Sequence, residues 1–187
     1  MNFFSPGFSS PMQSQSCFRG VLQALSRPGT MVTLEGILTP PPPLSPAAAA
    51  ILLTLADPFT AVSLPEGEAA REWLTFHARA RLTGPEAADF VLAFARPALA
   101  ALRQGTDDEP EDSATLILDC PSFALGRHYR LTGPGIETET IVTLPLDENF
   151  LPEWRAQSRN APRGVDVILC AGTNIIGLPR SLTIEEI

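Results

Sequence analysis

The feature that most constrains the fold of this chain is the alternation of helical and strand-like hydrophobic patterns along its 187 residues. Helical spacing of apolar residues, together with cap signals, predicts helices at 14–26, 47–56, 66–78, 97–103 and 147–159. Alternating or β-branched residues predict strands at 31–34, 61–64, 79–83, 89–94, 114–120, 127–132, 136–144, 165–170, 174–178 and 182–185. Interleaved helices and strands in a chain long enough for one core predict an α/β three-layer sandwich with a mixed β-sheet.

Two local signals refine the predicted sheet. The stretch 165–170 is continuously apolar, which is typical of a strand buried on both faces. Gly133-Pro134-Gly135 separates two predicted strands and indicates a hairpin between them. A local hairpin pairs its strands antiparallel, so we do not expect a purely parallel sheet.

The predicted helices differ in their apolar faces. Helix 14–26 carries a stripe of Phe18, Val21, Leu22 and Leu25, and helix 66–78 places Ala69, Trp73, Phe76 and His77 on one side. Helix 47–56 is apolar on every side, so it belongs either in the core or under a subunit interface.

Three further segments have local signatures of their own. Ser45 and Pro46 form an N-cap and first-turn pair before helix 47–56. The four prolines at 40–43 predict an extended segment. Five acidic residues within 107–112 predict a solvated loop, which we call the acidic loop.

All the basic residues are arginines. The chain has thirteen arginines and no lysine, against 21 acidic residues, for a net charge of −8. The absence of lysine excludes a Schiff-base mechanism and a phosphate loop of the G-x-x-x-x-G-K-[ST] type, because both need a lysine amine. An acidic chain also lacks the cationic excess that broad binding to nucleic acid or to an anionic membrane requires. We therefore expect no nucleic-acid partner and no membrane association.

The N-terminal residues and the cysteines predict the compartment. Residues 1–11 lack the basic start and apolar stretch of a secretory signal, which predicts a cytoplasmic protein. Cys17, Cys120 and Cys170 form no C-x-x-C pair and lie in apolar segments, as buried structural thiols do. We expect no metal site and no cofactor. We also expect one domain over residues 1–187, with residues 1–12 as a loosely ordered segment.

A small group of residues could bind a ligand. His77 lies on an apolar helix face, where it is either a hydrogen-bonded structural residue or an acid, base or donor. Without lysine, side-chain recognition of an anion depends on arginine, and Arg19, Arg130 and Arg180 lie on or beside predicted elements. Gly133 and Gly135 could let backbone N–H groups approach an anion, although any tight hairpin also needs such glycines.

Several short motifs occur in a recognisable order. They are Ser16-Cys17-Phe18-Arg19, Ser26-Arg27-Pro28-Gly29, Leu52-Leu53-Thr54-Leu55-Ala56-Asp57, Phe76-His77, Ala114-Thr115-Leu116-Ile117-Leu118, Arg130-Leu131-Thr132-Gly133-Pro134-Gly135-Ile136, Gly164-Val165-Asp166 and Leu178-Pro179-Arg180. In this order they resemble the PhnH family, the H subunit of the bacterial carbon-phosphorus lyase system. The resemblance extends from about residue 16 to residue 184. The chain departs from the family pattern at the proline run, the acidic loop and the connection 157–162.

The resemblance implies a role in the breakdown of organic phosphonates. It implies a core complex with the G, I and J subunits, in a pathway where a phosphonate displaces adenine from ATP to give alpha-D-ribose 1-phosphonate 5-triphosphate. The I subunit of that system is regarded as catalytic. The resemblance also implies a fold similar to pyridoxal-phosphate-dependent transferases without the cofactor, and a homodimer when the subunit is isolated.

Two functional expectations follow. The first is a structural and assembly subunit without an active site of its own, because the sequence contains no convincing nucleophile, metal set or Schiff-base lysine. The second is an anion site for phosphonate or nucleotide phosphate, formed by Arg19, His77, Arg130, Gly133, Gly135 and Arg180.

Overall fold

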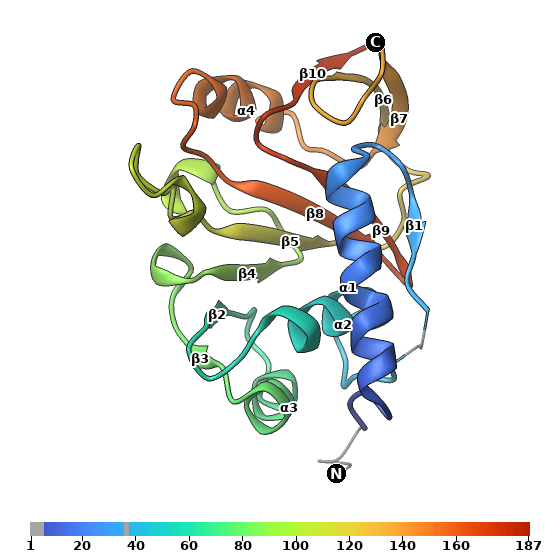
Figure 1. Cartoon of the computed structure of the whole chain (residues 1–187), viewed down its shortest axis with the longest axis vertical. Coiled ribbons are helices and arrows are strands. Elements are labelled where there is room, and N and C mark those ends of the chain that lie inside the picture. Colours follow the sequence, from blue (N-terminus) through green and yellow to red (C-terminus); the bar gives the residue numbers. More distant parts are fainter. Residues whose placement is uncertain (1–5, 36–37) are drawn as a thin grey trace.

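A computed structural model describes residues 6–35 and 38–187 of the chain (Figure 1). The helices are α1 (Pro11–Ser26), α2 (Pro46–Leu55), α3 (Glu68–Ala78) and α4 (Phe150–Ser158), with short 3-10 turns η1 (Pro85–Ala87), η2 (Leu99–Ala101) and η3 (Pro110–Asp112). The strands are β1 (Val32–Thr33), β2 (Ala61–Ser63), β3 (Arg81–Leu82), β4 (Phe90–Ala93), β5 (Thr115–Asp119), β6 (Arg127–Thr132), β7 (Thr140–Leu144), β8 (Asp166–Ala171), β9 (Asn174–Leu178) and β10 (Thr183–Glu186).

The strands form two sheets. The larger has seven strands in the order β1-β9-β8-β5-β4-β2-β3, and the smaller has three in the order β10-β6-β7. Strands β3, β2, β4, β5 and β8 run parallel, while β9 pairs antiparallel with both β8 and β1. This confirms the α/β class with a large mixed sheet. The predicted hairpin of β6 and β7 is also confirmed, but it belongs to the separate smaller sheet, which the sequence did not predict.

The larger sheet is the middle of three layers. Helices α1, α2 and α3 cover one face, and α4 with the smaller sheet covers the other (Figure 1). Side chains of β5 alternate accordingly, with Ile117 on the helix side and Leu116 and Leu118 on the opposite side. Strand β8 alternates in the same way, so the predicted burial of this strand on both faces is confirmed.

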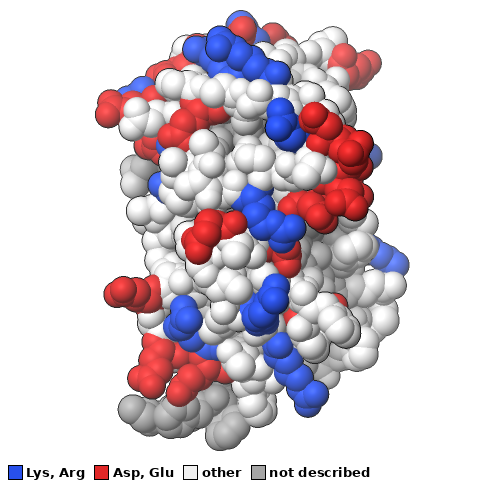
Figure 2. All heavy atoms as spheres, turned by 90° about the vertical axis from the view of Figure 1, so that its left-hand side faces the viewer, with Lys and Arg blue, Asp and Glu red and all other residues white. Residues whose placement is uncertain are grey.

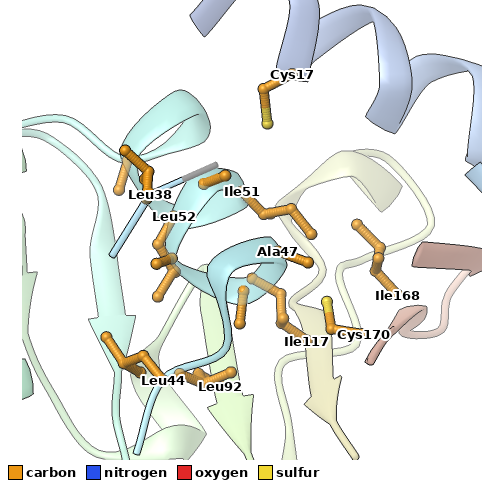
Figure 3. Packing of buried hydrophobic residues seen from close by; sticks show 14 of the residues in the cluster. Cys17, Leu38, Leu44, Ala47, Ile51, Leu52, Leu92, Ile117, Ile168 and Cys170 are labelled. Carbon is orange, nitrogen blue, oxygen red and sulfur yellow. The ribbon is translucent and has the colours of Figure 1, made fainter. Parts of the chain in front are cut away.

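Helix α2 lies in the core between the sheet and the other helices. The Ser45 hydroxyl accepts a hydrogen bond from the Ala48 N–H at 3.2 Å, which confirms the predicted N-cap. Residues 47–52 of α2 are all buried. Figure 3 shows Ile51 and Ala47 beside Ile117 and Cys170 of the sheet. The apolar character of α2 therefore serves the core of this chain.

The predicted faces of α1 and α3 are confirmed only in part, at Val21, Leu25 and Trp73, and the buried face of each helix is otherwise displaced by about one residue. The buried residues of α1 are Cys17, Gly20, Val21 and Ala24, and those of α3 are Ala70, Trp73, Leu74 and Ala78. Phe18, Leu22 and Phe76 are exposed instead, Leu22 to 51%. Small residues allow a helix backbone to approach a sheet closely, and a pattern based on large apolar residues gives them too little weight.

The proline run also differs from its prediction. The segment turns rather than extends: the Leu44 N–H donates to Pro41 O at 3.2 Å, and the Pro42–Pro43 peptide is cis. Proline has a fixed φ that suits tight turns as well as extended chain. The turn delivers Ser45 to the start of α2.

Some predicted boundaries change as well. The expected helix at 97–103 is only the 3-10 turn η2, and β7 begins at Thr140 because residues 133–139 form the hairpin loop. Strands β3 and β4 do not pair with each other, since both flank β2. Of the expected loosely ordered segment 1–12, residues 1–5 lie outside the described residues and Pro11 already belongs to α1. Across 6–35 and 38–187, no helix combines the length and the apolar character needed to cross a membrane.

Candidate functional site

Arg130 on β6 faces carboxylates from the hairpin loop and from β10. Its Nε atom lies 3.0 Å from Glu139 Oε2, and its Nη1 atom lies 3.6 Å from Glu185 Oε2. The buried Nε makes no aligned hydrogen bond with any described residue, so the contact with Glu139 is an ion pair without hydrogen-bond geometry. The Arg130 side chain is 40% exposed, and an incoming anion would compete with both carboxylates for it.

Arg180, between β9 and β10, is engaged inside the protein. Its Nη1 atom donates to Pro110 O at 2.7 Å, to Ser113 Oγ at 2.6 Å and to Gly164 O at 2.9 Å. Its Nη2 atom lies 3.4 Å from Asp166 Oδ2. These contacts join the acidic loop to the start of β8, so the geometry gives Arg180 a structural role.

His77 and Arg19 lie on the helix layer. The His77 ring contacts Trp73 and Phe76 edge-on, with ring centroids 5.1 and 5.0 Å apart. Helix α3, which carries His77, lies at the opposite end of the molecule from β6 (Figure 1). Arg19 is on the exposed side of α1. The structure therefore does not bring His77 together with Arg130.

The surface has a cleft away from these predicted residues, at the carboxyl ends of the parallel strands β2, β4 and β5. Three adjoining hollows of about 490, 540 and 380 Å³ share Phe94. We call them together the carboxyl-edge cleft, whose main lining residues are Ser45, Ser63, Leu64, Pro65, Phe94, Ala95, Arg96, Asp119, Cys120, Asp147, Glu148, Asn149 and Glu153. Ligands of α/β proteins commonly bind at this edge of a sheet, where loops leave the strand ends.

A larger hollow of about 780 Å³ follows the outer surface of α3 from Glu66 to Phe76. The described residues that line it belong to α3 and to the turn before it. The carboxyl-edge cleft instead brings together side chains from several strands and from α4. We therefore take the cleft as the candidate functional site.

Arg96 organises the charged part of the cleft. Its Nε atom donates to Asp147 Oδ2 at 2.7 Å, its Nη1 atom donates to Glu153 Oε2 at 2.8 Å, and the guanidinium lies 5.5 Å from the centre of the Phe150 ring. Hydrogen bonds to Asp147 and Glu153 raise the Arg96 pKa above its usual range, and the same bonds lower the pKa of both carboxyl groups. Only 5% of the Arg96 side chain is exposed. With both carboxylates ionised, the cluster of Arg96, Asp147 and Glu153 carries a net negative charge.

Asp119, at the end of β5, lines the smallest hollow and contacts the N-terminal end of α2. It is 6% exposed, and its Oδ2 atom accepts the Ser45 N–H at 2.9 Å. Burial raises the Asp119 pKa, and its hydrogen bonds with Ser45 partly offset that effect. The N-terminus of a helix is a favourable place for an anion, and here the protein's own carboxylate fills it.

Cys120 follows Asp119 and lines two of the three hollows. Its Sγ atom donates to Cys170 O at 3.0 Å. Burial, followed by the charge of Asp119, raises the Cys120 pKa to about 11, so the thiol is protonated at neutral pH. A protonated thiol is a weak nucleophile, which agrees with a structural thiol.

Sequence reasoning missed the residues of this cleft, although one signal could have found them. Asp119 ends an apolar strand, and Arg96 comes shortly after another. When parallel strands are expected, polar residues just past their ends are the first candidates for a site. The pairing of Arg96 with Asp147 and Glu153 had no such signal, because it joins residues more than fifty positions apart.

Comparison with known proteins identifies the family. The family described as bacterial phosphonate metabolism protein (PhnH) matches residues 6–185. The chain belongs to the PhnH family. It is 32% identical, over 98% of its length and 96% of the relative, to "Alpha-D-ribose 1-methylphosphonate 5-triphosphate synthase subunit PhnH" of Rhizobium meliloti (strain 1021). It is 33% identical, over 95% of its length and 88% of the relative, to "Putative C-P lyase subunit protein HtxG" of Stutzerimonas stutzeri.

Two of the motifs that resemble PhnH pack against each other. A Cβ atom on Gly135, whose φ is 85°, would overlap the Ser26 carbonyl oxygen. A Cβ atom on Gly29, whose φ is 79°, would lie 2.8 Å from Leu131 Cδ1. The hairpin loop thus rests on the end of α1, and its glycines permit this close approach. This is a structural use of Gly135, one of the two glycines that the sequence offered as anion ligands.

The absence of lysine limits the cofactor chemistry that the chain can support. The chain has no lysine, so it cannot form the Schiff base that holds pyridoxal phosphate. Within the described ranges, no three His, Cys, Asp or Glu side chains are grouped so as to hold a metal ion. The described lining of the cleft provides hydrogen-bonding groups, carboxylates and apolar side chains.

Proposed function

We propose that this chain is the H subunit of a carbon-phosphorus lyase core complex in organic phosphonate catabolism. It would support formation of alpha-D-ribose 1-phosphonate 5-triphosphate from ATP and a phosphonate, in association with G, I and J subunits. The observation that carries the proposal is the similarity to the Rhizobium meliloti subunit, which covers 98% of this chain and 96% of that protein. Similarity over nearly the full length of both chains favours the same role in the same kind of complex.

Within that complex we propose a structural and assembly role without an independent active site. The groups that could bind or react already have partners within the protein. Arg180 donates to backbone carbonyls, and Arg96 is paired with two carboxylates. The raised pKa of Cys120 keeps its thiol protonated. An enzyme of this class would need an activated nucleophile or a preorganised anion site. Neither is formed by the described residues of the carboxyl-edge cleft.

Co-purification tests this proposal. A tagged I subunit is expressed with G and J, with or without this chain, and its activity toward ATP and methylphosphonate is measured. We expect the chain to co-purify at a fixed ratio and to raise the yield or activity of the complex, while the chain alone shows no turnover. Association of G, I and J without any retention of this chain would contradict the proposal.

The anion site remains a second proposal, supported by the exposure of Arg130. The side chain is 40% exposed and lies 3.0 Å from Glu139 and 3.6 Å from Glu185, so a phosphonate oxygen could compete with these carboxylates for the exposed part of the guanidinium. Calorimetric titration with ATP and with methylphosphonate tests it, using Arg130→Ala and the matched Arg127→Ala, which removes another exposed, ion-paired arginine of β6. Loss of binding only in Arg130→Ala supports the site, and no binding by the unmodified chain excludes it.

The finer features of the resemblance stand as proposals too. They are a homodimer of the isolated chain, a fold related to pyridoxal-phosphate-dependent transferases and a cytoplasmic location. Light scattering of the isolated protein tests the dimer, and fractionation of cells that express it tests the location. A monomer at micromolar concentration would contradict the first of these.

A further inference from the structure

We propose that the carboxyl-edge cleft is the docking site for a basic segment of a partner protein, one in which an arginine or lysine lies next to an apolar residue. The inference rests on the proposed function, because it assumes that the chain works as a subunit. It adds the surface that is used and the chemistry of the segment that it receives. The motifs that carry the family resemblance do not include Phe94, Arg96 or Glu148 of this cleft.

Charge favours a cation in the cleft. The polar hollow of about 540 Å³ is lined by three carboxylates, those of Asp147, Glu148 and Glu153, and by the single guanidinium of Arg96. Asp119 adds a further acidic group in the neighbouring hollow. Like charges that face each other across an interface weaken binding, so this surface disfavours anionic partners and is complementary to basic ones.

The arrangement of the carboxylates leaves one of them available. Asp147 and Glu153 are held by Arg96, which is almost completely buried and therefore fixes their positions. Glu148 is exposed, and no hydrogen bond or ion pair of its side chain is found among the described residues. A partner cation can thus meet a free carboxylate beside two that are already positioned, which lowers the cost of ordering the site.

The shape of the cleft favours a polypeptide over a small ion. The hollow of about 490 Å³ next to the polar one is lined by apolar side chains such as Leu64, Pro65, Val91 and Pro97. Phe94 borders both hollows and is partly exposed. An aromatic ring at the junction can contact an apolar side chain with one part and a cation with its face. A segment with adjacent basic and apolar residues would fill both hollows at once.

The face opposite the cleft has a different distribution of charged side chains. Figure 2 shows the left-hand face of Figure 1, where arginines are spread among acidic side chains and the acidic side chains gather most densely at the upper right. The carboxyl-edge cleft instead combines a concave surface, an excess of carboxylates and an exposed aromatic ring. Such a combination is typical of anchoring sites in protein interfaces.

Charge reversal in the full-length chain tests the inference. Glu148→Arg changes the cleft, and Glu111→Arg makes the same charge change in the exposed acidic loop as a matched control. Affinity is measured for a purified complex of the G, I and J subunits. We expect Glu148→Arg to weaken binding at least tenfold and Glu111→Arg to change it less than twofold. Equal affinity of Glu148→Arg and the unmodified chain would overturn the inference. Failure of the unmodified chain to bind would instead contradict the proposed function itself.

Chemical labelling locates the partner independently of affinity. Asn149→Cys places a reactive thiol in the polar hollow without removing a side-chain cap, because Asn149 makes none. The native thiols give little background, since burial raises the pKa of Cys17, Cys120 and Cys170. We expect the G, I and J complex to slow maleimide labelling of this cysteine at least fivefold. Unchanged labelling in the assembled complex would refute the inference, as would protection by aminoethylphosphonate alone, which would identify a small-molecule site.

Discussion

The two faces of the seven-stranded sheet are covered by side chains of different size. The helix face packs small residues of α1 and α2 against the sheet, including Gly20, Ala24 and the alanines at 47–50. The opposite face packs the large aromatic side chains Tyr129, Phe150 and Trp154 beneath the smaller sheet and α4. On one face the helices lie close to the sheet, and on the other face bulky side chains fill the space between the layers.

The helix face depends on how closely backbones approach. A Cβ atom on Gly177 of β9 would lie 2.5 Å from the Ala24 carbonyl oxygen and 2.9 Å from the Leu25 nitrogen. Both neighbours are backbone atoms of α1, so they cannot move aside without moving the helix. On this face, added volume should be more harmful than lost volume.

The opposite face depends on polar partners within an apolar cluster. The Trp154 indole N–H donates to Leu182 O at 2.9 Å, and its ring stacks on Phe150 with centroids 5.2 Å apart. The Gln157 side chain forms two hydrogen bonds with the backbone of Val165, at 3.0 and 3.2 Å. On this face, lost volume and lost hydrogen bonds should be more harmful than added volume.

The largest effect should come from Trp154→Ala. Truncation of a buried tryptophan leaves a cavity and an unpaired Leu182 carbonyl, so we expect the free energy of unfolding to fall by about 3–5 kcal/mol. Urea unfolding followed by circular dichroism measures it. Trp154→Phe should lose less, because it keeps much of the apolar area and removes only the hydrogen bond. Similar losses in both variants would mean that the hydrogen bond, and not the volume, holds this face.

The next largest effect should come from Gly177→Ala on the helix face. The added methyl group meets the backbone of α1, so we expect a loss of about 1–3 kcal/mol in the free energy of unfolding. Gly20→Ala is the matched control. Its Cβ atom would come too close to the flexible end of the Leu34 side chain, with Val32 Cγ1 at an ordinary 3.6 Å, and alanine is also better than glycine in a helix. A Gly177→Ala variant as stable as Gly20→Ala would remove the distinction between the two kinds of neighbour.

The sequence predicted the sheet better than the helices around it, and the reason is the size of the residues involved. The buried strands β5 and β8 each contain three consecutive large apolar residues, which give a clear signal. The buried sides of α1 and α3 include Gly20, Ala24 and Ala70, which hydrophobic periodicity hardly distinguishes from exposed positions. Their role becomes visible only when the opposing backbone is known.

The candidate site was harder to predict for a second reason. Sequence reasoning chose arginines by type and position, but it could not show that Arg180 is occupied by Pro110, Ser113 and Gly164. Nor could it pair Arg96 with Asp147 and Glu153, because those contacts depend on how α4 packs beside the end of β4. The sequence indicated most helices and strands, but it did not indicate which side chains from different layers contact one another.

A smaller effect should come from the cap of α2, which joins the helix face to the cleft. Ser45→Ala removes the hydrogen bond to the Ala48 N–H, so we expect a loss of about 1 kcal/mol in the free energy of unfolding. Ser10→Ala is the matched control, since Ser10 precedes α1 without a side-chain capping bond. Thermal or urea unfolding should show almost no change in the control. Equal losses in the two variants would show that the Ser45 hydroxyl is not what stabilises α2.

The smallest effect should be a change in how stability depends on pH, and it has opposite signs for the two sets of cleft carboxylates. Arg96 lowers the pKa of Asp147 and Glu153, so these groups stabilise the fold above their usual values, near pH 4, and lose that contribution as the pH falls through their folded values. Burial raises the pKa of Asp119, so its ionisation costs stability at neutral pH and the cost is relieved as the pH falls.

Two variants separate these contributions when urea unfolding is measured between about pH 7 and pH 3. Arg96→Met should lower stability at neutral pH and flatten its loss in acid, because Asp147 and Glu153 no longer gain a partner on folding. Asp119→Asn should steepen the net loss in acid, because it removes a cleft carboxyl whose protonation favours the folded state. If Asp119→Asn instead left the pH profile unchanged, the buried carboxyl at the start of α2 would be as well solvated as an exposed one, and the helix side of the cleft would be open to water.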